Sequence, residues 1–155
     1  MEKDLSNRLK VADLAIGYAL RLLEIEGPIT VRDGQMFAGS TLLNGDERLV
    51  DAVKAKTRFG CTVFLGNERI ATVASERGKT ERAVGTRANE EVTRIVFEQG
   101  GTFRGKTKTL GRWWAIVYVP LHDARGGEWG CSPPIENSGG SRGELPEARP
   151  HAVPG

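Results

Sequence analysis

Apolar positions near the start of the chain recur at steps of three and four residues. This spacing places their side chains on one stripe of a helix. The helix ends at Gly27-Pro28, because glycine is common just after a helix and proline cannot continue one. The residues of the stripe are Leu5, Leu9, Ala12, Ile16, Ala19, Leu20 and Leu23.

The next segment combines a turn dipeptide with short apolar runs. In ITVRDGQMFAG, apolar residues flank Asp33-Gly34. This dipeptide favours a two-residue hairpin turn because both positions can take a positive φ. We therefore predict a hairpin here. A second helix is predicted from Asp46 to about Lys56, and it stops near Phe59-Gly60.

Two further apolar segments, CTVFLG and RIATVA, predict neighbouring strands with a tight connection at Asn67-Glu68. Residues 75–87 are mostly polar, and we expect a long loop there that is a natural lid over the sheet. Asn89 is expected to cap a short helix that ends at Gly100-Gly101.

The last part of this pattern contains the most apolar segment of the chain. Residues 102–109 alternate weakly, and 113–120 form the strongest predicted strand, in which Trp114, Ile116 and Tyr118 share one side. The order is long helix, hairpin, helix, two strands, short helix, two strands. It predicts an α+β fold with the long N-terminal helix packed on an antiparallel sheet.

Composition narrows the functional classes. The 155 residues fit one domain, and the net charge of +2 comes from interspersed charges, which gives no basic stripe for nucleic acid. The two cysteines and two histidines lack metal-ligand spacing, and we expect neither a metal nor a cofactor. No apolar run approaches the roughly 20 residues of a membrane span, and no signal peptide begins the chain. Made as written, the chain is expected to be cytoplasmic.

One formal catalytic motif is present. Gly100, Gly105, Lys106 and Thr107 match the phosphate-binding loop G-x-x-x-x-G-K-[ST]. That loop must leave a strand and open a helix, whereas the pattern here predicts a helix before it and a strand after it. We expect a chance match, no catalytic residues and no enzyme. The alternative, a nucleotide-binding enzyme that uses Gly100–Thr107, requires the reverse order of elements.

A family resemblance covers most of residues 1–126, through the segment from 59 to 126 and the upstream DGQMFAGSTLLNGDERLVDAVK. Its most specific pieces are TVFLGNERIAT, then RAVGT at Arg82–Thr86, and an L-G-x-x-W/Y spacing that leads to Tyr118 and Pro120. These resemble single Cache-type sensor domains of bacterial chemoreceptors and sensor kinases. The resemblance implies a PAS-like, extracytoplasmic (periplasmic) sensor whose sheet binds a small molecule. It also implies that membrane contact belongs to segments of a parent receptor, and a homodimer through the N-terminal helix is a further expectation.

The resemblance and the chemistry of the side chains together suggest a binding site on the sheet beside the 75–87 loop. Arg69 can bind a carboxylate through two hydrogen bonds, which favours a small organic acid. Two alternatives stay open: Arg69 pairs with a surface acid such as Glu68 or Asp46, or the aromatic strand is plain core. Trp113-Trp114 also replaces the proline and tyrosine common in the family. The expected walls are Arg69, Trp114 and Tyr118, with Thr62, Phe64, Thr72 and Arg82 as secondary contacts.

The end of the chain departs from the family pattern. Residues 127–155 contain five of the seven prolines and few large apolar residues, which predicts disorder. GEWGCS stands where the family has an apolar final strand. Reverse translation of EWGCS allows such a strand in a shifted frame if the serine is encoded by TCN. We therefore hypothesise a frame change near Gly126-Gly127, a sensor domain over 1–126 and a missing final strand. The exposed edge would suit the remaining alternative, a structural α+β interaction module.

Overall fold

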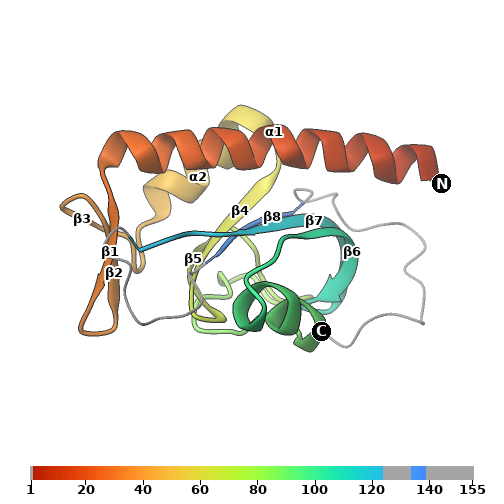
Figure 1. Cartoon of the computed structure of the whole chain (residues 1–155). Helices are drawn as coiled ribbons and strands as arrows, with labels where there is room; N and C mark the ends of the chain where they lie inside the picture. Colours follow the sequence, from red (N-terminus) through yellow and green to blue (C-terminus); the bar gives the residue numbers. More distant parts are fainter. Residues whose placement is uncertain (1, 124–133, 139–155) are drawn as a thin grey trace.

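The computed structural model describes residues 2–123 and 134–138. Its longest element is helix α1 (Glu2–Glu26), which lies across one face of a five-stranded antiparallel sheet (Figure 1). The second helix, α2 (Glu47–Thr57), packs beside α1 and on the same sheet. The predicted α+β class, with a long N-terminal helix on an antiparallel sheet, is confirmed.

Helix α1 ends where the sequence predicts. The amide of Gly27 donates to the carbonyl of Leu23 at 3.1 Å, and the chain then turns into β1 (Ile29–Arg32) and β2 (Gln35–Ala38). Asp33 and Gly34 join these strands with φ values of 52° and 75°, as a tight hairpin turn requires. A two-residue strand that was not predicted, β3 (Thr41–Leu42), completes a small second sheet in the order β1-β2-β3.

Local capping explains the bounds of α2. Asp46 accepts a hydrogen bond from the backbone amide of Arg48 at the start, and Arg58 ends the helix in the left-handed conformation. Strands β4 (Gly60–Leu65) and β5 (Glu68–Thr72) follow. Their turn consists of Gly66-Asn67, one residue earlier than predicted, because Gly66 takes the positive φ of 61° that the turn needs.

The predicted short helix has two parts. Asn89 caps α3 (Glu90–Val92), as expected, and the segment continues as a π-helical stretch, η1 (Thr93–Glu98). Strands β6 (Phe103–Thr109) and β7 (Arg112–Pro120) then form an antiparallel hairpin. Both of these strands were predicted.

The expectation of a missing final strand is wrong. Residues Pro134–Ser138 form β8, which pairs antiparallel with both β4 and β7, so the sheet order is β5-β4-β8-β7-β6. Without β8, the facing edges of β4 and β7 would leave backbone donors and acceptors unpaired inside the sheet. This backbone requirement outweighs the weak strand pattern of PIENS, and the expected disorder fails for these five residues. The rest of the predicted tail lies outside the described residues.

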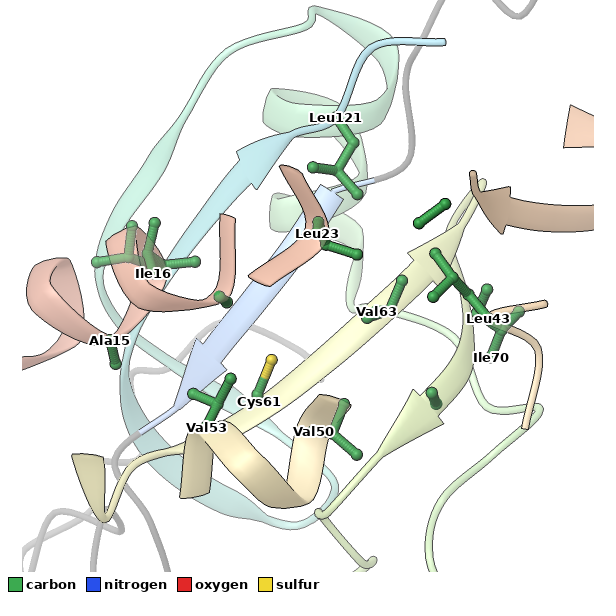
Figure 2. Close-up of a cluster of buried hydrophobic side chains, with 14 of the residues drawn as sticks. Ala15, Ile16, Leu23, Leu43, Val50, Val53, Cys61, Val63, Ile70 and Leu121 are labelled. Atoms are coloured by element: carbon green, nitrogen blue, oxygen red, sulfur yellow. The ribbon is translucent and has the colours of Figure 1, made fainter. Parts of the chain in front are cut away.

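The helix-facing side of the sheet holds an aliphatic core. Figure 2 shows side chains of α1 and α2 meeting those of β4 and β5, with Cys61 among them. Burying one such valine, leucine or isoleucine is worth roughly 1.5–3 kcal/mol, so this layer is a main source of stability. The labelled members of the core are Ala15, Ile16, Leu23, Leu43, Val50, Val53, Cys61, Val63, Ile70 and Leu121.

Candidate functional site

The opposite side of the sheet carries a second core, here called the aromatic face. It is covered by α3 and η1, the green helical segment on the far side of the sheet from α1 in Figure 1. Strands contribute Phe64, Phe103, Trp114, Ile116 and Tyr118, and the cover contributes Ala88, Val92, Val96 and Phe97.

Phe64 lies at the centre of this face. Its ring meets that of Phe97 edge-on, with centroids 5.6 Å apart, and lies 5.7 Å from the ring of Tyr118. Tyr118 in turn meets Phe103 edge-on at 6.1 Å. These separations are typical of stabilising aromatic pairs. The predicted Tyr118 therefore belongs to a packed cluster.

Arg69 lies beside the same ring and is fully buried. Its guanidinium carbon is 5.1 Å from the centroid of Phe64, within the range of a cation–π interaction. The guanidinium donates to the hydroxyl of Thr86 at 3.0 Å, the carbonyl of Arg87 at 2.8 Å and the hydroxyl of Thr109 at 3.0 Å. Arg69 thus joins β5, the 75–87 loop and β6, and it does not occupy the solvated surface position that the surface-pair alternative requires.

A β-bulge directs Arg69 to this face. Thr62 pairs with Thr72, but Phe64 pairs with Arg69, so β5 has one more residue than β4 over this stretch. Strict alternation would place Arg69 and Thr72, three positions apart, on opposite sides of the sheet. The extra residue brings both to the aromatic face.

Two buried hydroxyls lie next along these strands. Thr62 and Thr72 share a hydrogen bond of 2.5 Å, and the Thr72 hydroxyl also accepts from the amide of Ala74 at 3.0 Å. They supply polar groups that can exchange partners, because a hydroxyl both donates and accepts.

Residues 75–87, here called the covering loop, run from one edge of the sheet to the other. On the β5 side, Gly85 donates to the carbonyl of Arg69 and Ala83 to that of Ala74, both at 2.8 Å. On the other side, the amide of Arg77 donates to the carbonyl of Leu110 in the β6–β7 turn at 2.9 Å. The loop therefore protects the β5 edge and reaches across to the β6–β7 hairpin.

The two adjacent tryptophans of β7 point to opposite faces. Trp114 belongs to the aromatic face, and its indole N–H donates to the carbonyl of Thr109 at 3.0 Å. Trp113 lies on the other side of the strand, with the ammonium of Lys106 5.8 Å from its ring centroid. Only Trp114 of the two lies with the predicted site.

Arg82 is the predicted site residue that lies elsewhere. Its guanidinium bonds to Asp51 of α2 at 2.8 Å and to the carbonyl of Thr72 at 3.2 Å. It thus meets the helical layer at the margin of the sheet. The other six predicted residues, Thr62, Phe64, Arg69, Thr72, Trp114 and Tyr118, gather on the aromatic face.

Sequence reasoning missed several polar groups of this face. The amide of Asn89, predicted only as a cap, donates to the hydroxyl of Thr107 at 2.8 Å and the carbonyl of Lys108 at 2.9 Å. The available signal was the alternation of threonines in β6. Among the residues whose burial the structure describes, all buried polar or charged side chains are on this face or at its cover: Thr62, Arg69, Thr72, Asn89, Thr107 and Thr109.

The phosphate-loop match lacks its required context. Gly105, Lys106 and Thr107 lie within strand β6, and a second strand follows, so the motif does not open a helix as a phosphate-binding loop must. The buried Thr107 hydroxyl accepts from Asn89. The predicted inverted order of elements is confirmed.

Other site types have little support in the described part of the chain. It holds no cluster of three or more histidine, cysteine or acidic side chains suited to a metal. Across the same residues, no helix is both long and apolar enough to cross a bilayer. Two surface hollows, of about 380 and 160 Å³, lie beside the C-terminal half of α1, and none of the seven predicted ligand-binding residues lines them.

Comparison with known proteins places this geometry in a family. A family model described as "Single cache domain 3" matches residues 41–131, which is more than half of the chain. Neither a curated protein nor a solved structure matches the chain. Cache domains are in general sensory domains that bind small-molecule ligands, typically outside the cytoplasm. The matched range contains β4 to β7, the covering loop and the aromatic face, and the chain belongs to the single Cache domain family.

Proposed function

We propose that the chain senses a small organic anion, a carboxylate above all, bound on the aromatic face beneath the covering loop. The observation that carries this proposal is the segregation of buried polar groups. The described buried polar side chains gather on the aromatic face and its cover, although the helix-facing side of the same sheet packs aliphatic groups. Burying a polar group costs free energy unless hydrogen bonds replace those it made with water. The concentration of such groups beside aromatic rings is typical of a ligand site.

Arg69 determines the favoured charge of the ligand. Two of its hydrogen-bond acceptors, Thr86 and Thr109, are neutral hydroxyls. A carboxylate is a stronger acceptor for a guanidinium than a hydroxyl is, and it can accept two parallel bonds. A bound acid would therefore replace one or both threonines at Arg69. Its apolar body would lie against Phe64 and Trp114.

A thermal-shift screen tests the proposal. The panel consists of acetate, propionate, pyruvate, succinate and benzoate, with matched amines such as propylamine and benzylamine. A ligand present at about 100 times its Kd adds roughly 2.7 kcal/mol of stability. Calorimetric titration then compares the parent with Arg69→Lys and Trp114→Phe. The matched control is Trp113→Phe, which changes the neighbouring tryptophan on the opposite face.

The expected result is a carboxylate hit whose affinity falls at least tenfold, about 1.4 kcal/mol, in Arg69→Lys and Trp114→Phe. Trp113→Phe should leave that affinity within twofold. Equal binding by Arg69→Lys and the parent would place the site elsewhere. A panel in which only amines bind would refute the charge assignment.

We further propose that the domain works as a homodimer through α1. A second apolar row, on the flank of α1 away from the core, is exposed: Val11 by 38%, Leu14 by 73% and Ile25 by 73%. Tyr18, which is half-buried against the edge of the aliphatic core, links these positions at steps of three, four and seven residues, the spacing of a helix–helix seam. Leu14→Glu should lower the mass measured by sedimentation equilibrium from dimer to monomer. The exposed control Glu24→Lys, off this row, should not, and a monomeric parent would overturn the proposal.

The parent protein is proposed to be a bacterial receptor that presents this domain outside the cytoplasm. Family membership supports this location, and chemotaxis or two-component signalling is the proposed output. The sequence of the flanking gene region tests it. Membrane-spanning segments next to this domain, with a chemoreceptor or kinase transmitter, are expected. Their absence in every frame would contradict the proposal.

A further inference from the structure

Arg82 connects the covering loop to the helical layer. Its Nη1 lies 2.8 Å from a carboxylate oxygen of Asp51, and its Nε lies 3.8 Å from one of Glu47. Both acids belong to α2. The same Nη1 donates to the carbonyl of Thr72, the last residue of β5, at 3.2 Å. One side chain therefore touches the loop, the sheet edge and a helix on the other face.

Two arginines fasten the covering loop from opposite sides. Arg69 lies inside and donates to Thr86 and to the carbonyl of Arg87. Arg82 is itself part of the loop and reaches outward to α2. The side chain of Arg82 is 32% exposed and that of Asp51 is 48% exposed. Solvent therefore screens the Arg82–Asp51 ion pair, so Arg82 holds the loop more weakly than the buried Arg69 does.

We propose that Arg82 is a latch, which holds the covering loop closed over the aromatic face by bonding it to Asp51 and Glu47 of α2. Opening the loop breaks these bonds, so the position of the loop is linked to the helical layer. The role of the loop in ligand binding rests on the proposed function, in which the ligand reaches the aromatic face beneath this loop. The latch itself exists without ligand.

Hydrogen exchange of the free protein tests the latch directly. The amides of residues 75–87 are followed by mass spectrometry in the parent, Arg82→Ala, Asp51→Asn and the double variant. The matched control is Arg104→Ala. It removes a comparably exposed pair, Arg104–Asp13 at 2.8 Å, which joins β6 to α1 and does not touch the loop.

The expected result is about two- to fivefold faster exchange of the loop amides in Arg82→Ala, the factor that an exposed ion pair supports. Asp51→Asn should have a smaller effect, because Glu47 still faces Arg82. In the Arg82→Ala background, Asp51→Asn should add nothing further. Arg104→Ala should leave the loop amides unchanged. Raising NaCl from 0.05 to 1 M should speed loop exchange in the parent but not in Arg82→Ala.

Three results would overturn the latch. Unchanged loop exchange in Arg82→Ala would show that the bonds do not hold the loop. An equal increase in Arg104→Ala would mean general destabilisation. An effect of Asp51→Asn that is as large without Arg82 as with it would show that the two are not coupled. None of these measurements uses a ligand, so they stand apart from the outcome of the carboxylate screen.

Discussion

The junction between α1 and the β1–β2 hairpin should tolerate no side chain at Gly39. This residue follows β2 with a φ of 61°, and its amide donates to the carbonyl of Pro28 at 2.8 Å. A Cβ placed here would overlap the carbonyl oxygen of Glu26 and lie 3.3 Å from the Cα of Gly27. Both obstacles are backbone atoms, which cannot rotate away. Gly39→Ala must therefore move the end of α1 or the hairpin.

The destabilisation expected for Gly39→Ala has two parts, a backbone cost and a steric cost. Left-handed backbone at alanine costs about 1–2 kcal/mol, and an overpacked contact adds roughly 1–3 kcal/mol, so Gly39→Ala should destabilise by about 2–5 kcal/mol. Gly45→Ala isolates the first part, because Gly45 has a φ of 76° and no atom within 4 Å of its Cβ position. Urea unfolding followed by tryptophan fluorescence measures both. Equal destabilisation of the two variants would refute the steric argument.

Three further predictions concern single side chains. The hydrogen bond from Arg48 lowers the pKa of Asp46, so the stability that ionised Asp46 contributes is complete above about pH 4 and is lost as the pH falls through the lower folded pKa. In urea unfolding, the free energy of unfolding of the parent should exceed that of Asp46→Asn near pH 6 but not near pH 2. A difference between the two proteins that does not change with pH would contradict this. Lys106→Ala should stay folded, because it removes a contact with the Trp113 ring. In calorimetry, the parent and the variant should both show only background binding of ATP. A loss of ATP affinity in the variant would revive the enzyme alternative. Asn89→Ala should destabilise by about 1–3 kcal/mol in thermal unfolding, because it leaves buried partners unsatisfied; an unchanged Tm would show that water replaces the amide.

Local signals account for the elements that the sequence predicts correctly. The stripe of α1, the Asp33-Gly34 turn and the Asn89 cap each lie within a few residues of the structure that they specify. Such features depend on backbone preferences and on one buried face, and these are present in the sequence itself. The small shift of the β4–β5 turn has the same origin, because Gly66 accepts a positive φ more readily than Glu68.

The features that escaped prediction depend on contacts across the sheet. Strand β8 exists because β4 and β7 both need a partner, and nothing within PIENS announces this. The bulge that turns Arg69 toward Phe64 depends on the register between two strands, which alternation within β5 cannot reveal. For Arg82, the family resemblance indicated the aromatic face, but the acids that attract it lie on α2, about thirty positions earlier in the chain.

Exposed ion pairs connect the helical layer to both edges of the sheet. Arg104 joins edge strand β6 to Asp13 of α1, and Arg82 joins the loop beside the other edge strand, β5, to Asp51 of α2. The partly exposed Arg82–Asp51 pair is worth about 0–1 kcal/mol. A ligand that binds one arrangement of the loop and is present at about 100 times its Kd supplies roughly 2.7 kcal/mol. Because this exceeds the worth of the Arg82–Asp51 pair, a ligand bound beneath the loop, as proposed, would supply enough free energy to break the Arg82 contact.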